Sequence, residues 1–236
     1  ISGGDLRYAL NILETCSVSN YKSKVITYDF INNNYKNNFS SDNNDDNHYD
    51  AVSALQKSIR GSDVNAALYY LARLCAVNDL PSIERRLSII AYEDVGLANP
   101  AAVDRVRNAL ETARDVGFPE AIIPLGFVVC DLALSPKSRA SVDAIEETYD
   151  YVIKHDLPIP DYLKYTPVGL KDEEKYPYDR PDLWEKIQYL PEMIKDMEFY
   201  KPKGLSKYEK GLNDNYSRLK STKRTKDIKN LKKIKQ

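Results

Sequence analysis

Residues 49–73 read YDAVSALQKSIRGSDVNAALYYLAR. Apolar side chains recur at helical spacing both before and after Gly61. A glycine is typical of a helix end, and Asp63, two residues later, is typical of the residue that caps the start of the next helix. The stretch therefore predicts two amphipathic helices joined by a tight turn. We expect Asp50 to cap the first of them in the same way.

The helical pattern continues from this stretch toward residue 154. Pro81 and Pro100 lie where helices are expected to begin, and apolar residues recur at helical spacing after each of them. The segment 121–134 is apolar on nearly every side, which predicts a central helix surrounded by protein. Another helix is expected over 138–154. The predicted fold class is therefore all-α.

The remaining segments define the predicted domain organisation. Residues 31–47 are too rich in Asn and Asp to form a core, which indicates a linker. From about 158 to 202 the chain is rich in proline and tyrosine, which is typical of an extended arm anchored by aromatic residues. We predict one or two helices over 1–30, the linker over 31–47, a helical domain with its arm over 48–217, and a basic tail over 218–236.

Composition narrows the class of protein. The chain has 236 residues, of which 42% are hydrophobic, enough for a substantial core. Cys16, Cys75 and Cys130 are widely spaced within apolar helical patterns, so buried free thiols are expected rather than disulfides, and no metal site is expected. No apolar run approaches the length of a membrane span, so we expect an intracellular protein that does not contact a membrane.

The first thirteen residues, ISGGDLRYALNIL, place a Gly-Gly-Asp turn before a helix with an early arginine, Arg7. This arrangement resembles the sensor 2 segment of the lid of an AAA+ ATPase. In such lids the arginine points back at the nucleotide, where a guanidinium can contact the terminal phosphate. The alternative is that Asp5 simply caps an ordinary amphipathic helix.

Over roughly residues 1–220 the chain is similar to the replication-associated recombination protein A family (RarA, also called MgsA), bacterial relatives of the Werner-helicase-interacting ATPases. The match comes in order along the chain. After 49–73 it continues through ERRL at 84–87, YEDVGLANP at 92–100, GFPEA at 117–121, SPKS at 135–138, QYLP at 188–191 and Phe199-Tyr200.

The resemblance implies a function for the parent protein. It implies lid helices followed by a helical oligomerisation domain that forms a homotetramer, in a DNA-dependent ATPase that acts at replication forks beside single-stranded-DNA-binding protein, in the cytoplasm with the nucleoid. The sequence itself holds no Gly-x-x-x-x-Gly-Lys-Ser/Thr loop. We therefore expect no catalytic residue and no cofactor in this chain, whereas the parent protein would use ATP and magnesium.

Charged residues of the helical domain have two interpretations. Glu93 and Asp94 are adjacent carboxylates that can act as an acid and a base. Adjacent helical residues do not share a face, so we favour ion pairs that fix how helices or subunits meet. The candidates for these ion pairs are Arg60, Asp63, Arg73, Arg85, Arg86, Glu93, Asp94 and Lys137.

The tail is strongly basic although the whole chain has a net charge of −1. Such segregation favours contact with a polyanion. The DNA-binding candidates are Lys220, Lys223, Arg224, Lys226, Lys229, Lys232, Lys233 and Lys235. A solvated tail without this role remains an alternative.

Three hypotheses follow for the function of the chain. We favour the lid and tetramerisation portion of a DNA-dependent ATPase in fork maintenance, recombination and repair. A helical scaffold without DNA contact is the second hypothesis. The third is a self-contained enzyme that uses Glu93 and Asp94.

Overall fold

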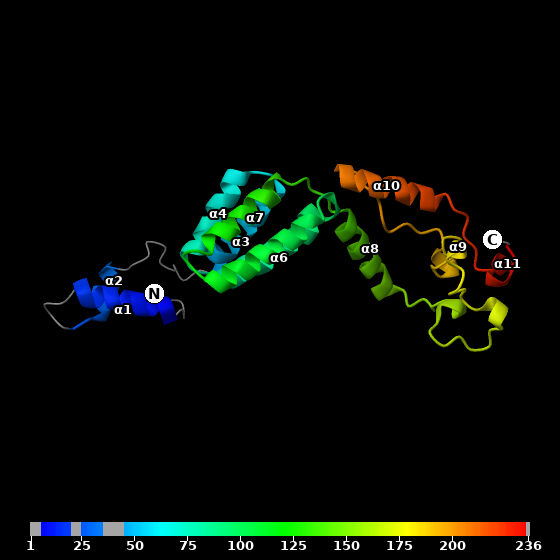
Figure 1. Ribbon diagram of the computed structural model, residues 1–236, viewed down its shortest axis with the longest axis horizontal. Coiled ribbons are helices and arrows are strands. Elements are labelled where there is room, and N and C mark those ends of the chain that lie inside the picture. The colour runs from blue at the N-terminus through cyan, green and yellow to red at the C-terminus, as the bar shows by residue number, and fades with distance from the viewer. Residues whose placement is uncertain (1–5, 20–24, 35–44, 235–236) are drawn as a thin grey trace. The chain divides into compact units, whose positions relative to one another are not determined.

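The computed structural model describes residues 6–19, 25–34 and 45–234, and these are all-α, as predicted. Figure 1 shows the helices. The α-helices are α1 Leu6–Ser19, α2 Tyr28–Asn34, α3 Asp45–Arg60, α4 Val64–Ala76, α5 Leu80–Ile90, α6 Ala101–Val116, α7 Ile122–Leu134, α8 Ala140–Lys154, α9 Pro181–Trp184, α10 Lys207–Lys220 and α11 Ile228–Lys232. Short helical turns are η1 Ala91–Val95, which is a π-helix, η2 Gly96–Ala98, η3 Asp161–Leu163, η4 Asp172–Glu174 and η5 Glu192–Ile194.

The chain divides into two compact units, one of residues 1–94 and 100–135 and the other of residues 95–99 and 136–236. The main core of the first unit lies between α3, α4, α5, α6 and α7. Fully buried leucine and isoleucine side chains of α3, α4 and α5 fill it, among them Leu55, Ile59, Leu74, Ile83 and Leu87. Burial of each such side chain stabilises the fold by roughly 1.5 to 3 kcal/mol.

The turn between α3 and α4 forms as the sequence predicts. Helix α3 ends at Arg60, directly before Gly61, and the carboxylate of Asp63 accepts a hydrogen bond from the backbone N–H of Ala66 at 3.0 Å. This bond satisfies one of the N–H groups at the start of α4 that have no partner inside the helix. The predicted cap at Asp50 is wrong, because α3 begins at Asp45 and Asp50 lies within it.

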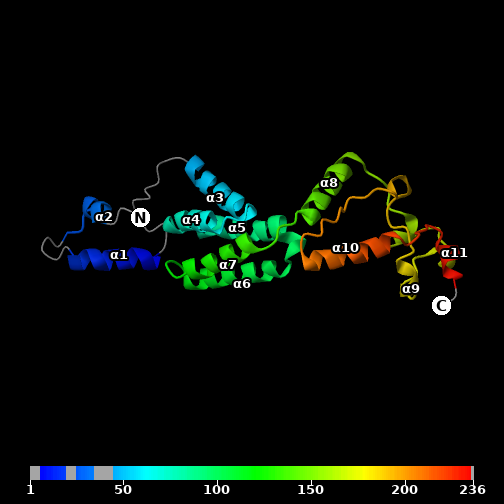
Figure 2. The ribbon, with the colours of Figure 1, turned by 90° about the horizontal axis from the view of Figure 1, so that it is seen from above.

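The helix predicted over 121–134 forms as α7, but the prediction that protein surrounds it is wrong for the described part of the chain. Helix α7 packs against α4 and α6, and Figures 1 and 2 both show α7 beside α6. Leu125, Val128 and Leu132 are fully buried on that side. The opposite side is exposed: Ile123 is 72% and Phe127 63% exposed. The helix is apolar all round, but the described part of the chain covers only one of its faces.

The second unit has a small core of its own. Leu183 and Ile187 of the arm pack with Ile228 and Leu231 of the tail. Backbone hydrogen bonds between residues 186–188 and Thr225 form an isolated parallel bridge that holds the two segments together. Both α8 and α10 contact η2. The tail is therefore folded against the arm.

The predicted domain boundaries remain predictions. Residues 35–44 of the predicted linker lie outside the described residues, α2 runs across the boundary expected near 30, and α10 runs across the one expected at 217. Within the described part of the chain, no helix is both long and apolar enough to cross a membrane.

Candidate functional site

Arg7, the predicted sensor residue, lies in the first turn of α1, one residue after the helix begins at Leu6. Its backbone is therefore at the helix start that the sequence predicts. Its side chain lies outside the described residues. On the same helix Ile12 and Cys16 are buried, whereas Leu10 and Leu13 are exposed.

The predicted ion-pair residues Arg60, Glu93 and Asp94 lie together. Arg60 at the end of α3 contacts both carboxylates of η1, with its Nε 2.5 Å from Asp94 Oδ1 and its Nη2 3.1 Å from Glu93 Oε1. The guanidinium is wide enough to bind two adjacent carboxylates through different nitrogens. The side chain of Asp94 is fully buried, whereas that of Arg60 is 46% exposed.

Gln56 and Arg86 extend this cluster. The amide nitrogen of Gln56 donates to Asp94 Oδ2 at 3.3 Å, and its oxygen accepts from Arg86 Nη1 at 2.6 Å. The cluster therefore ties α3 and α5 to η1. Its carboxylates are engaged by Arg60 and Gln56, which supports a positioning role rather than acid-base chemistry. Among the described residues, no group of three or more His, Cys, Asp or Glu side chains is placed to hold a metal ion.

The other ion-pair candidates are Asp63, Arg73, Arg85 and Lys137. Asp63 caps α4. Arg73 on α4 and Arg85 on α5 are exposed. Lys137 lies half-buried in the connection between α7 and α8.

A buried carboxylate that the sequence analysis missed belongs to Glu209 of α10. This side chain is fully buried and accepts hydrogen bonds from the hydroxyl of Ser138 and from the backbone N–H of Leu205. Ser206, the N-cap of α10, accepts from the N–H of Glu209. The pattern Ser206-x-x-Glu209 is the signature of a capping box, so the sequence contained a signal for this contact.

Gly96 lies against the same region. Its φ is +48°, and a Cβ atom there would lie 2.6 Å from the carbonyl oxygen of Ser138. The contact joins the segments YEDVGLANP and SPKS that the sequence analysis singled out. Both segments therefore serve to place α10 and the start of α8 around η2.

Three of the tail cations form ion pairs with carboxylates of the arm, and two more donate hydrogen bonds to uncharged oxygens. Their contacts are Lys220 with Glu198, Lys226 with Glu192, Lys229 with Glu173, Lys232 with the carbonyl of Asp172, and Lys233 with Asn230. A hydrogen bond from Lys229 lowers the pKa of Glu173, and bonds from Lys195 and Lys226 lower that of Glu192. Lys235 lies outside the described residues.

Lys223 and Arg224 differ from these cations. Both are exposed, and neither forms an ion pair with another residue in the described part of the chain. They lie in the connection between α10 and α11, next to Thr225 of the parallel bridge.

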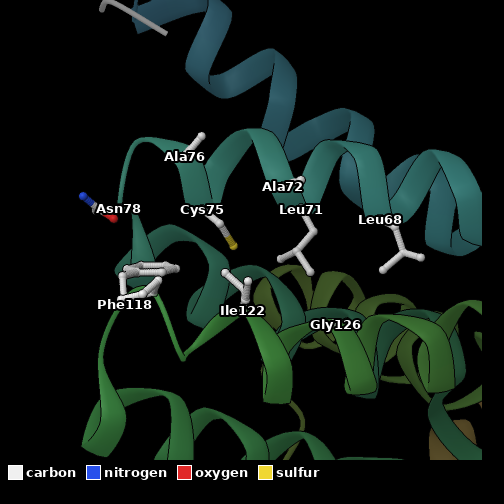
Figure 3. A pocket seen from close by; sticks show the side chains of 10 residues that line it. Leu68, Leu71, Ala72, Cys75, Ala76, Asn78, Phe118, Ile122 and Gly126 are labelled. Atoms are coloured by element: carbon white, nitrogen blue, oxygen red, sulfur yellow. The ribbon is translucent and has the colours of Figure 1, made fainter. Parts of the chain in front are cut away.

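A groove of about 670 Å³ lies between α4 and α7. Figure 3 shows Leu71 and Cys75 of α4 pointing toward Ile122 of α7, with Phe118 at one end. Burial raises the pKa of the Cys75 thiol to about 11, so the thiol is protonated at neutral pH. An uncharged thiol in an apolar groove is a weak nucleophile, and this groove has no feature of a catalytic site.

A helix with an early arginine followed by an all-α domain agrees with the C-terminal portion of an AAA+ ATPase. Comparison with family models agrees. A model described as "MgsA AAA+ ATPase C terminal" matches residues 61–220, and one described as "AAA C-terminal domain" matches residues 1–60. The chain therefore belongs to the MgsA family of AAA+ ATPases.

Individual relatives support the same assignment. "Replication-associated recombination protein A" of Bacillus subtilis (strain 168) is 45% identical over 92% of this chain and 54% of its own length. The Escherichia coli (strain K12) protein of that name is 31% identical over 84% of this chain and 48% of its own length. "ATPase WRNIP1" of Dictyostelium discoideum is 29% identical over 86% of this chain and 26% of its own length. The chain thus spans about half the length of the bacterial relatives.

Proposed function

We propose that this chain is the lid and tetramerisation portion of a DNA-dependent AAA+ ATPase that acts in replication-fork maintenance, recombination and repair. The observation that carries the proposal is the match over 92% of the chain to a relative named replication-associated recombination protein A. Single-stranded-DNA-binding protein and other fork proteins are its proposed partners, in the cytoplasm beside the nucleoid.

In this proposal ATP and magnesium are bound by residues outside the present sequence, and Arg7 contacts the terminal phosphate. A charge-assisted hydrogen bond of this kind contributes about 1.5 to 3 kcal/mol, so its loss slows turnover roughly 10- to 100-fold. The test is Arg7→Ala in the protein that carries this chain with its ATPase domain. The control is Arg107→Ala, because Arg107 is an exposed arginine of α6. Equal turnover in both variants would remove the sensor assignment.

Tetramerisation is supported by apolar helix faces that the chain itself leaves uncovered. On α7 these are Ile122, Ile123, Phe127 and Leu134, and on α8 they are Ile145, Tyr149, Val152 and Ile153, all of them at least half exposed. Contiguous exposed apolar residues of this kind mark protein interfaces. Each of the two helices therefore offers a surface that a second copy can bury.

Light scattering of the chain at micromolar concentration tests this part of the proposal. Phe127→Glu places a charge on the exposed face of α7 and is expected to lower the mass below that of a tetramer. Val168→Glu is the matched control, because Val168 is 84% exposed in the arm and outside both faces. A monomer mass for the unaltered chain would contradict the proposal.

DNA contact is assigned to the cations of the tail. Their ion pairs with the arm are exposed and screened by water, so phosphates can replace the carboxylates. Such contacts position the DNA without reading its sequence. Affinity is expected to fall with salt, with a log-log slope of roughly −0.7 to −0.9 for each phosphate neutralised.

Deleting the tail is a poor test, because it also removes Ile228 and Leu231 from the small core. A sharper variant replaces Lys226, Lys229 and Lys233 by Gln and leaves the core intact. Fluorescence anisotropy with a single-stranded oligonucleotide is expected to show weaker binding and a smaller salt slope. Unchanged affinity would assign the DNA contact to another part of the protein.

The ion pairs of the tail also favour one alternative, a helical scaffold whose lysines serve only to fix the tail to the arm. In that case the chain forms the same assembly and its anisotropy titration with DNA is flat at low salt.

A further inference from the structure

Aromatic side chains gather on one part of the arm. The ring of Tyr176 lies 4.9 Å from that of Tyr178, 6.5 Å from that of Trp184 and 6.3 Å from that of Tyr189, measured between centroids. We call these four residues the aromatic cluster. Its members belong to segments on both sides of α9 and to α9 itself.

Hydrogen bonds hold the polar ends of three of the four rings, and the fourth ring, that of Tyr178, packs against Tyr176. The indole N–H of Trp184 donates to the carbonyl of Pro177 at 2.9 Å, and the hydroxyl of Tyr189 lies 2.9 Å from that of Tyr176. Even so, Tyr178 is 79% and Trp184 40% exposed. Rings that are held in place and still exposed lose little conformational entropy when a ligand stacks on them.

The parallel bridge brings cations to this cluster. Thr225 pairs with Ile187, which lies two residues before Tyr189. Arg224 therefore lies beside the arm, and its positive charge partly opposes the rise in the pKa of Tyr189 that burial causes. Lys223 and Arg224 form no ion pair with a described carboxylate; Lys232 and Lys233 form none either, but these two donate hydrogen bonds to uncharged oxygens.

Two of the carboxylates near the cluster are paired within the protein, whereas Asp179, next to Tyr178 in the chain, is exposed and forms no ion pair with a described residue. Asp182 forms two hydrogen bonds with Arg180, and Glu185 forms two with Arg218. Because their charges are paired, Asp182 and Glu185 repel an approaching phosphate less than unpaired carboxylates would. Exposed aromatic rings next to available cations are the combination that binds single-stranded nucleic acids.

We propose that the aromatic cluster, together with Lys223 and Arg224, binds single-stranded DNA. Bases stack on the exposed rings of Tyr178 and Trp184, and the two cations contact the adjoining phosphates. Duplex DNA is excluded from stacking because its bases are already stacked inside the helix. This inference rests on the DNA contact proposed above and adds where, and in which form, the DNA is bound.

The chain contains a single tryptophan, Trp184, which makes the test direct. Trp184 can be excited selectively, and its fluorescence is expected to be quenched when the chain is titrated with oligo-dT at low salt. An abasic strand of the same length supplies the phosphates without the bases, and a hairpin duplex supplies paired bases. Both are expected to bind more weakly than oligo-dT and to cause little quenching.

Variants separate stacking from charge. Tyr178→Ala is expected to weaken oligo-dT binding about tenfold, the loss of one stacked base, while Tyr178→Trp retains binding. Tyr165→Ala is the matched control, because Tyr165 is a fully exposed tyrosine of the arm outside the cluster. Replacing Lys223 and Arg224 by Gln is compared with the same change at Lys207 and Lys210, exposed lysines at the other end of α10.

The possible results distinguish the stacking site from the proposed DNA contact. If the chain binds oligo-dT and Tyr178→Ala binds it equally well, the stacking site is wrong while the proposed DNA contact stands. Equal affinity for the abasic strand would likewise overturn the stacking site and leave charge as the whole interaction. If neither strand nor duplex binds the unaltered chain, both this inference and the DNA contact fall.

Discussion

Replacing Arg60 by leucine tests the role of the charged cluster at η1. The variant leaves the fully buried Asp94 carboxylate with only the hydrogen bond from Gln56 among the described residues. Breaking a buried ion pair by removing one partner costs about 3 to 5 kcal/mol. Because Arg60 is 46% exposed, water already weakens the pair. We therefore expect a loss of about 2 to 3 kcal/mol, at or below the lower limit of that range.

Urea unfolding followed by circular dichroism measures this loss. The matched control is Arg114→Leu, which breaks an ion pair with Glu84 on the surface, where the arginine is 57% exposed. Such exposed pairs contribute about 0 to 1 kcal/mol. In thermal unfolding the Arg60 variant is expected to melt roughly 4 to 12 °C below the unaltered chain.

A second change makes the experiment more specific. Asp94→Asn removes the buried charge, so adding it to Arg60→Leu is expected to restore about 1 kcal/mol or more. If Arg60→Leu and Arg114→Leu unfold at the same urea concentration, the cluster does not hold η1 in place and the reasoning is refuted.

The remaining predictions concern backbone, carboxylates and thiols. Gly96→Ala forces a Cβ against Ser138 at positive φ and is expected to destabilise the fold by about 1 to 3 kcal/mol. Gly211→Ala in α10, with open space around it, is expected to stabilise the fold by up to about 1 kcal/mol. Equal urea midpoints for the two variants would contradict this prediction. Hydrogen bonds from lysines lower the pKa values of Glu173 and Glu192 from 4.5. Their stabilisation of the tail is therefore complete above pH 4.5 and is lost as the pH falls through the lowered pKa values. In a pH titration followed by Trp184 fluorescence, the midpoint should fall in that pH window at low salt, and the fluorescence should change less at high salt. Cys75, with its pKa raised to about 11, should react with iodoacetamide at pH 8 more slowly than the half-buried Cys130, as peptide mass mapping can show.

The fold class could be predicted from the sequence because the signals for helix ends and apolar helix faces each act over a few neighbouring residues. Gly61 and Asp63 fix the turn between α3 and α4 by satisfying backbone groups at the helix ends. The helix over 138–154 was predicted from its apolar spacing and begins within two residues of the expected position. The prediction for Asp50 was wrong because the capping signal is local, whereas α3 extends back through polar residues to Asp45.

Contacts across the chain were harder to predict. The apolar surface of α7 indicated burial, but the sequence pattern cannot tell whether the covering surface belongs to the same chain. The charge of the tail was evident, but its pairing with Glu173, Glu192 and Glu198 depends on a fold that joins residues far apart in sequence. Glu209 had a local capping signal, whereas its contact with Ser138 had none.

The central claim is that this chain is a self-assembling, DNA-contacting portion of an AAA+ ATPase. The most direct measurement is the mass of the complete chain in solution by light scattering, at micromolar concentration and low salt, with and without a single-stranded oligonucleotide. We predict four times the mass of the chain without DNA, and that mass plus the oligonucleotide when DNA is present. A mass equal to that of one chain under both conditions would contradict the claim.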